Sequence, residues 1–166
     1  MREQIQFLLD GANVRRYHTL TTIVQETVGH HSHGVALLAC MLSPTSPSTD
    51  LIFAALVHDL AEHQVGDIPA PSKRQFGIGE QISALEERLL ESSGWAPGML
   101  TSDELRTLKL ADIAQGALYC VEELQRGNSR MRVVLDRYLS YATAMILVGV
   151  EKKLFDEIER MGNECK

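Results

Sequence analysis

The sequence has little of what builds a disulfide framework, a secretion signal or a membrane span. It contains three cysteines in 166 residues, and this odd number, without metal-ligand spacing, favours a reducing compartment. Its apolar runs, residues 51–57 among them, are all far too short to cross a bilayer. The N-terminus lacks the apolar core of a secretion signal. We therefore expect a cytoplasmic protein that contacts no membrane.

Positive charge is also in short supply. The chain has 16 Lys and Arg against 22 Asp and Glu, a formal net charge of -6, which argues against binding of polymeric nucleic acid. A small phosphate ester can still bind through a few local cations or a metal ion. The length is sufficient for one domain with a hydrophobic core. We predict a single domain over residues 1–166.

Helical periodicity dominates the chain, and no convincing strand alternation is present, so we predict an all-α bundle of about six helices. Asp50 is a candidate N-cap, and Thr101 begins a capping box with Glu104. Two prolines make residues 66–71 irregular, and Gly149 weakens the last helix. The helices with recognisable limits cover about residues 31–42, 50–64, 80–91, 101–127 and 131–161.

Histidines are concentrated near the N-terminus. All six lie between His18 and His63, although the chain continues to residue 166. His58 is followed by Asp59 at the end of the apolar segment 51–57. A buried charged Asp is costly unless it is paired or bound to a cation. This placement makes His58 and Asp59 candidate metal ligands.

Asp112 is a second acid within an apolar helical stretch, and His31 shares a helix face with apolar residues. Together with His58 and Asp59 they would form a mixed nitrogen and oxygen site on three helices. Such ligands suit a divalent cation such as Zn, Co, Mn, Fe or Mg. From the residues alone a second interpretation stays open, in which His31 is a core histidine and the acids are buried partners of Arg or Lys.

A series of short motifs runs in order from residue 15 to residue 128: Arg16-Tyr17, His31-Ser32, His58-Asp59 with Glu62, Gly66-Asp67-Ile68-Pro69 followed by Lys73, Asp112, and the segment Glu122 to Asn128. This series resembles the HD-domain phosphohydrolases, and within them the short deoxynucleotide phosphohydrolases of bacteria and phages. The sequence departs from their pattern at His30, where Glu is usual, and at Tyr17, where Trp is common. Both departures bear on substrate choice.

The resemblance implies a metal held by His31, His58, Asp59 and Asp112. It also implies that Glu62 and Asp67 orient water or protonate the leaving oxygen. Glu62 lies four residues after His58 and hence on the same helix face, near the metal. Without the resemblance, the residues alone favour a solvated helix-end carboxylate for Glu62 and a turn residue before Pro69 for Asp67.

The substrate contacts predicted on this basis are basic, aromatic and small polar residues. Arg16, Lys73 and Lys109 are candidate phosphate contacts, although ordinary solvated charge explains such residues as well. Tyr17 is a candidate for stacking on a base or packing against the sugar, with core packing as its alternative. Thr19, with Leu20 beside it, is a candidate for shaping a pocket that rejects a ribose 2'-hydroxyl.

Two reactions agree with the resemblance. One cleaves a deoxynucleoside triphosphate to deoxynucleoside and triphosphate, and the other removes the phosphate of a deoxynucleoside monophosphate. The basic pairs at residues 15–16 and 73–74 favour the triphosphate, since it carries more negative charge. The choice of dATP is implied by the resemblance, because the segment from Arg16 to Thr19 is similar to the N-terminal segment of the phage enzymes. A nucleotide-binding protein without turnover is a third alternative. If a phage encodes the chain, the expected location is the host cytoplasm. The apolar residues 144–148 suggest a homo-oligomer interface or burial in the monomer.

Overall fold

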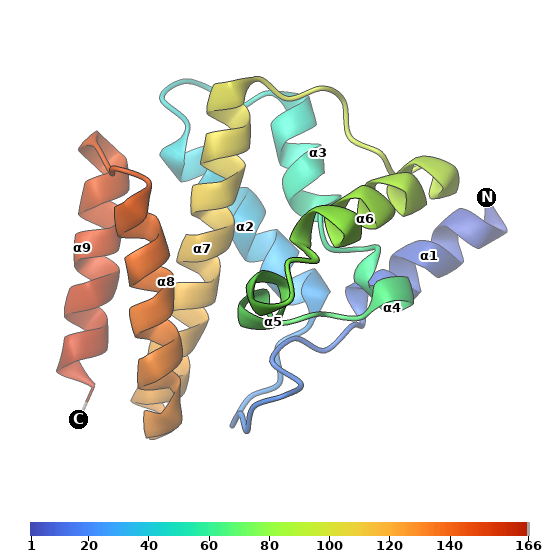
Figure 1. Ribbon diagram of the computed structural model, residues 1–166. Coiled ribbons are helices and arrows are strands. Elements are labelled where there is room, and N and C mark those ends of the chain that lie inside the picture. The colour runs from blue at the N-terminus through green and yellow to red at the C-terminus, as the bar shows by residue number, and fades with distance from the viewer. Residues whose placement is uncertain (166) are drawn as a thin grey trace.

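The computed structural model describes residues 1–165, and in these residues the chain is all-α (Figure 1). The one β-type pairing in this range is an isolated bridge between Arg15 and Thr27. No helix in it is long and apolar enough to cross a membrane. The helices are α1 (Arg2–Ala12), α2 (Val28–Leu42), α3 (Thr49–Val57), α4 (Glu62–Val65), α5 (Ala70–Gln75), α6 (Gly79–Ser93), α7 (Ser102–Gln125), the 3-10 helix η1 (Ser129–Met131), α8 (Arg132–Ala144) and α9 (Gly149–Glu164).

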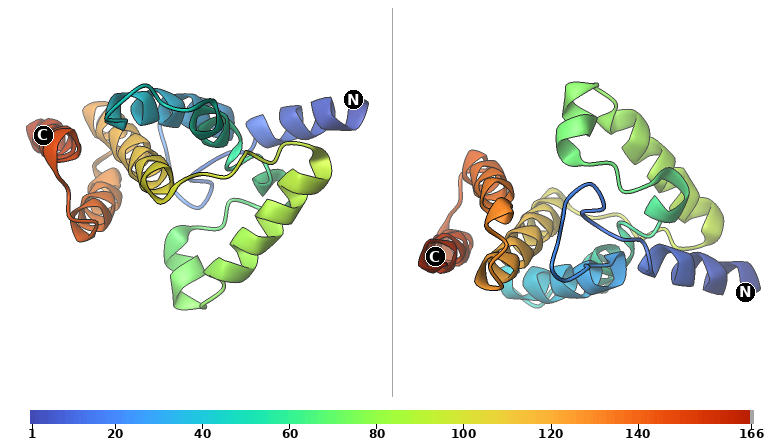
Figure 2. Two further views of the ribbon diagram at one scale, coloured as in Figure 1. Left: turned by 90° about the horizontal axis from the view of Figure 1, so that it is seen from above. Right: turned by 90° about the horizontal axis from the view of Figure 1, so that it is seen from below.

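Helix α7 is the centre of the core. It packs against α2 on one side and against α8 and α9 on the other (Figure 1). Alanines on its buried faces, such as Ala114 and Ala117, allow the neighbouring helices to approach closely. Leu135 of α8 and Ile158 of α9 fill the space opposite, and burial of each such side chain contributes about 1.5–3 kcal/mol. Figure 2 shows α5 and α6 standing apart from α7 and α8, with the α1–α2 loop between them.

Local signals account for several helix ends. The capping box of Thr101 and Glu104 is present at the start of α7. Gly94, with φ of +77°, ends α6 in the left-handed region that favours glycine. The region predicted as one helix over residues 131–161 forms two helices, α8 and α9, because the helix is interrupted at residues 145–148. This interruption lies next to the predicted weak point at Gly149. Ile146 and Val148 there are exposed, so an oligomer interface at this segment stays a prediction.

Other helix limits differ from the prediction. The N-cap of α3 is Ser48 rather than Asp50, because the Ser48 hydroxyl accepts the Leu51 N–H at 3.0 Å. The helix ends at Val57 and not near residue 64, since residues 58–61 continue as turns with tighter i to i+3 hydrogen bonds. Helix α1 was not predicted. Helix α5 lies partly in the segment predicted to be irregular, with a proline in its first turn, where the missing N–H costs nothing.

The loop between α1 and α2 is tethered by Glu123 of α7. Its fully buried carboxylate accepts hydrogen bonds from the backbone N–H groups of Ile23 (2.7 Å) and Val24 (2.8 Å) and from the Asn128 amide (2.8 Å). Burial raises the pKa of Glu123, but these donors hold it below its usual value. The Asn128 amide also donates to the Thr21 carbonyl at 2.9 Å. The 122–128 motif thus positions the loop that carries Arg16 to Thr19.

Replacing Glu123 by Gln is expected to destabilise the protein by about 1–3 kcal/mol, because one amide oxygen cannot serve three donors and buried N–H groups are left unpaired. The shift of the urea unfolding midpoint measures this loss. Glu122→Gln is the matched control: the Glu122 side chain is 59% exposed and pairs with Arg126 one turn away, so a change within about 0.5 kcal/mol is expected. Equal midpoints for both variants would contradict the tether.

Candidate active site

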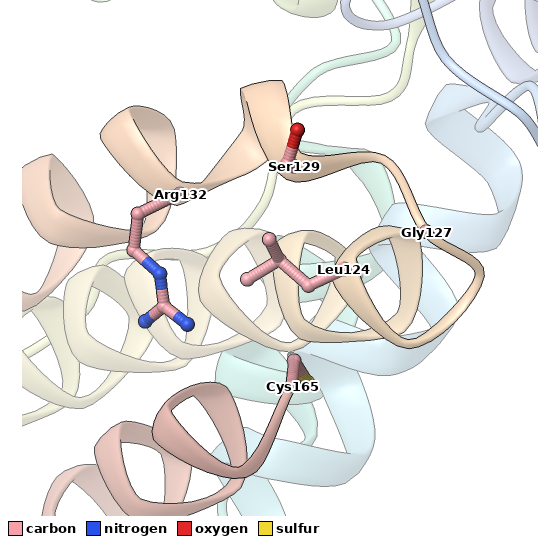
Figure 3. Close-up of a pocket in the computed structure, with 5 residues that line it drawn as sticks. All are labelled: Leu124, Gly127, Ser129, Arg132 and Cys165. Carbon is pink, nitrogen blue, oxygen red and sulfur yellow. The ribbon is translucent and has the colours of Figure 1, made fainter.

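A cavity of about 850 Å³ lies between the α4–α6 segment and helices α7 and α8, beside the α1–α2 loop. All predicted site residues except His31 line it: Arg16, Tyr17, Thr19, His58, Asp59, Glu62, Asp67, Lys73, Lys109 and Asp112. His31 is fully buried behind this lining. A smaller cavity of about 280 Å³ at the C-terminal end of α7 is lined by Leu124, Gly127, Ser129, Arg132 and Cys165 (Figure 3). None of those residues belongs to the predicted site.

The four predicted metal ligands come together from α2, the turn after α3, and α7. One ligand atom each of His31, His58 and Asp112 lies within 4.8 Å of the others. His31 Nε2 is 3.3 Å from Asp112 Oδ1. Asp59 Oδ2 is 3.4 Å from His58 Nε2 and 3.6 Å from His31 Nε2. Tertiary packing therefore gathers residues that are far apart in the sequence around one point.

The hydrogen bonds of the two histidines fit a cation at this point. The Nε2 atoms of His31 and His58 are buried and have no hydrogen-bond partner among the described residues. Each Nδ1 faces an acceptor: the Ala55 carbonyl for His58, at 3.0 Å, and the Gln115 side-chain oxygen for His31. A neutral imidazole with its proton on Nδ1 presents a lone pair at Nε2. Two such lone pairs beside two carboxylates form a donor set for a divalent cation.

Electrostatics favour the protonation states that metal ligands need. Burial lowers the pKa of His58, even though the Asp59 carboxylate opposes this shift. Burial disfavours the charged form of Asp112, but Lys109 holds the pKa of that carboxyl well below its usual range. The pKa of Asp59 is also lowered, because His58 and Arg16 outweigh the cost of burial. Neutral imidazole and charged carboxylates are the metal-binding forms of these groups.

Arg16 is buried beside the ligand cluster. One guanidinium nitrogen, Nη1, donates to Asp59 Oδ2 at 2.6 Å, and Nε donates to Glu26 Oε2 at 3.2 Å. Arg16 therefore orients a candidate metal ligand as well as lining the cavity. Glu26 was not predicted, because nothing in its local sequence distinguishes it from a solvated acid.

The other predicted phosphate contacts are ion-paired within the cavity wall. Lys109 Nζ lies 2.7 Å from Asp112 Oδ2, and Lys73 Nζ lies 3.4 Å from Glu86 Oε1. Two further basic residues, Arg74 and Arg137, also line the cavity. The predicted basic pair at residues 73–74 thus belongs to the cavity as a unit, whereas Arg15 is exposed and is not among the residues that line the cavity.

Glu62 is a buried acid at the cavity wall, with 5% of its surface exposed. Burial, together with the charges of Asp59 and Asp67, raises the pKa of Glu62 to about 9. Its Oε2 atom has no hydrogen-bond partner in residues 1–165. The raised pKa favours the protonated form of Glu62, which is the form that can donate a proton. Asp67 lies nearby on the 66–69 segment, with Oδ2 at 3.7 Å from His18 Nδ1.

The Tyr17 ring is packed within the protein and also lines the cavity, so its contact with a base or sugar stays a prediction. It stacks on Tyr119 with ring centroids 4.7 Å apart, and its hydroxyl hydrogen-bonds to that of Tyr138 at 2.9 Å. Its φ of +55° is unusual for a non-glycine residue. Thr19 is exposed at the cavity. Tyr138 and Tyr141 of α8 were not predicted, although their spacing from Val134 by four and seven residues places all three on one face of the helix.

Comparisons with known proteins agree with this geometry. The family model described as HD domain matches residues 12–130. The 5'-deoxynucleotidase YfbR of Photorhabdus temperata is 27% identical over 149 residues, covering 75% of each chain. Its Salmonella typhi counterpart is 24% identical over 152 residues, covering 75% of this chain and 74% of the relative.

Two solved structures have a similar fold. A Listeria innocua HD-domain phosphohydrolase aligns with a TM-score of 0.79 and 19% identity, over 98% of this chain and 90% of the other. The cyanophage S-2L HD phosphohydrolase DatZ, bound to dA and one catalytic Zn²⁺ ion, aligns with a TM-score of 0.68 and 19% identity over 96% of each chain.

The matched segment contains every residue of the candidate metal site. His31, the adjacent pair His58 and Asp59, and Asp112 all lie between residues 12 and 130, and they converge in space as described above. HD phosphohydrolases use divalent metal ions, in agreement with the donor set found here. The chain therefore belongs to the HD domain family of phosphohydrolases.

Proposed function

We propose that this phosphohydrolase cleaves 2'-deoxynucleoside triphosphates, dATP in particular, to the deoxynucleoside and triphosphate. The observation that carries the proposal is a candidate metal site at a cavity of about 850 Å³. Several basic side chains also line this cavity. A triphosphate has more negative charge than a monophosphate and needs more positive charge around it. The basic side chains that line the cavity are Arg16, Lys73, Arg74, Lys109 and Arg137.

The substrate class is supported by the relatives. The curated relatives are 5'-deoxynucleotidases, and the phage phosphohydrolase with a similar fold is bound to dA. Both point to deoxynucleotides. A cavity volume of about 850 Å³ is within the range of small-molecule pockets.

In the proposed mechanism, His31, His58, Asp59 and Asp112 would hold the metal ion. When bound, such an ion lowers the pKa of a coordinated water and neutralises phosphoryl oxygens. Glu62 is the buried carboxyl group placed at the cavity wall to donate a proton to the leaving 5'-oxygen of the deoxynucleoside. Asp67, on the same side of the cavity, orients the attacking water.

A 5'-deoxynucleotidase is the second candidate function. The names of the curated relatives favour it. The ion pairs Lys73–Glu86 and Lys109–Asp112 also favour it, because part of the positive charge is already compensated by protein carboxylates. The positive charge that remains near the metal site would then be neutralised by a single phosphate group.

Product analysis separates these functions. Protein loaded with Zn²⁺, Co²⁺ or Mn²⁺ is incubated with dATP and, separately, with dAMP, and the phosphorus products are identified by ³¹P NMR. The expected result is tripolyphosphate and deoxyadenosine from dATP. Orthophosphate from dAMP with dATP untouched would overturn the triphosphate proposal in favour of the second candidate. Absence of products with either nucleotide, under conditions where metal is bound, would support binding without turnover.

A further inference from the structure

Gln115 links the candidate metal site to a buried acid that neither the motifs nor the proposed mechanism includes. It lies one turn after Asp112 on α7, and its side-chain oxygen contacts Nδ1 of His31. Its amide nitrogen donates to Glu26 Oε1 at 2.7 Å. The other oxygen of Glu26 accepts from Arg16 Nε at 3.2 Å. The result is a continuous series of hydrogen bonds from a carboxylate to the imidazole of His31.

The chemistry of this series fixes which nitrogen of His31 carries the proton. The Glu26 carboxylate only accepts hydrogen bonds, so it turns the NH₂ end of the Gln115 amide towards itself. The amide oxygen, now facing His31, also only accepts. Nδ1 must therefore carry a proton, and in the neutral imidazole Nε2 then keeps its lone pair towards the ligand cluster.

The alternative tautomer would block metal binding. Nε2 of His31 lies 3.3 Å from Asp112 Oδ1 and 3.6 Å from Asp59 Oδ2. A proton on Nε2 would be attracted by both carboxylates and would occupy the position that a cation needs. Two negative groups thus favour the wrong tautomer, and Gln115 is the group that opposes them.

The residues packed around Gln115 leave room for its side chain to reach His31. Gly34 lies three residues after His31 on α2, on the same face, and a Cβ atom there would lie only 2.8 Å from Gln115 Cγ. Glycine leaves the space that the Gln115 side chain occupies. Glu26 is 5% exposed and His31 is fully buried, so water has little access to either end of the series.

We propose that Glu26 and Gln115 form a relay that sets the tautomer of His31 for metal binding. Both are positioning residues, since they act through His31 and do not touch the metal ion. The relay rests on the proposed function only in taking His31 as a metal ligand. Partners that orient a metal-bound histidine typically contribute 10–100-fold to metal affinity.

The test uses the metal-free full chain with ¹⁵N-labelled histidine. In the wild type, long-range ¹H–¹⁵N correlation is expected to show His31 protonated on Nδ1. In Gln115→Leu the proton is expected on Nε2, and the zinc dissociation constant measured by calorimetry is expected to rise about 10–100-fold. Gln125→Leu, at an exposed position on the same helix, is the matched control and should change neither. Glu26→Gln leaves the Gln115 amide free to turn and should give a mixture of tautomers.

The outcomes separate the relay from the proposed function. Zinc that binds the wild type without changing the His31 signals overturns the metal assignment of His31, and with it both the proposed site and the relay. Zinc that binds at His31 with the same dissociation constant and tautomer in Gln115→Leu overturns the relay alone. Should Gln115→Leu fail to fold, the wild-type spectrum still decides, because a proton on Nε2 in the metal-free protein contradicts the relay.

Discussion

Asp59→Ala is expected to abolish hydrolysis and to release the metal ion. The substitution removes one carboxylate from the ligand cluster and leaves the buried guanidinium of Arg16, now 2.6 Å from Asp59 Oδ2, without that partner. An unpaired cation beside the cluster further disfavours a metal ion. We expect a rate at least about 10³-fold lower, or roughly 4 kcal/mol of lost transition-state stabilisation. Initial rates on deoxynucleotides and elemental analysis of bound metal measure the two effects.

Asp136→Ala is the matched control for this substitution. Asp136 is exposed on α8 and is not among the cavity-lining residues, so both metal content and rate should stay at the wild-type level. Circular dichroism of both variants checks that the helices are retained. Hydrolysis that survives Asp59→Ala at the wild-type rate would show that Asp59 is not a metal ligand.

Glu62→Gln is expected to lower the rate by about 10²–10⁴-fold, the usual contribution of a general acid, while the metal content is unchanged. The amide keeps the shape of the side chain but has no acidic proton for the leaving oxygen. Rate and metal content measured on the same preparation separate this result from that of Asp59→Ala. Loss of metal together with rate would assign Glu62 to metal binding instead.

The same substitution should change how stability depends on pH. Burial raises the pKa of Glu62 from 4.5 to about 9, so between these values the folded protein holds a proton that the unfolded chain releases. The stabilisation is complete below about pH 4.5 and is lost as the pH rises through about 9. The cost at alkaline pH is on the order of a few kcal/mol.

Urea unfolding of metal-free protein at pH 5 and pH 9 tests this dependence. The wild type should lose more stability over this interval than Glu62→Gln, which has no carboxyl group at that position. Glu87→Gln on the exposed side of α6 should follow the wild type. Parallel pH dependence in all three proteins would contradict a raised pKa of Glu62.

Local sequence determined most of the helices and the members of the candidate metal site. Periodicity and capping residues act over one or two turns, so the start of α7 at Thr101 and the end of α6 at Gly94 follow from neighbouring residues. His58, Asp59 and Asp112 were recognisable as polar residues in apolar segments, and the motif series added Glu62 and Asp67. Helix α1 and the end of α3 were missed, because tertiary contacts and turns decide those limits.

Only the tertiary structure decided which groups support the site. Gln115 contacts His31, which is 84 residues away in the sequence, and Glu26, which is 89 residues away. Glu123 accepts a hydrogen bond from the loop residue Ile23, which is 100 residues away. No local pattern encodes such pairs, since their hydrogen bonds exist only after α7 has packed against α2 and the α1–α2 loop. The sequence by itself determined the chemical groups of the candidate metal site, whereas packing decided their protonation and orientation, because burial and long-range hydrogen bonds control both.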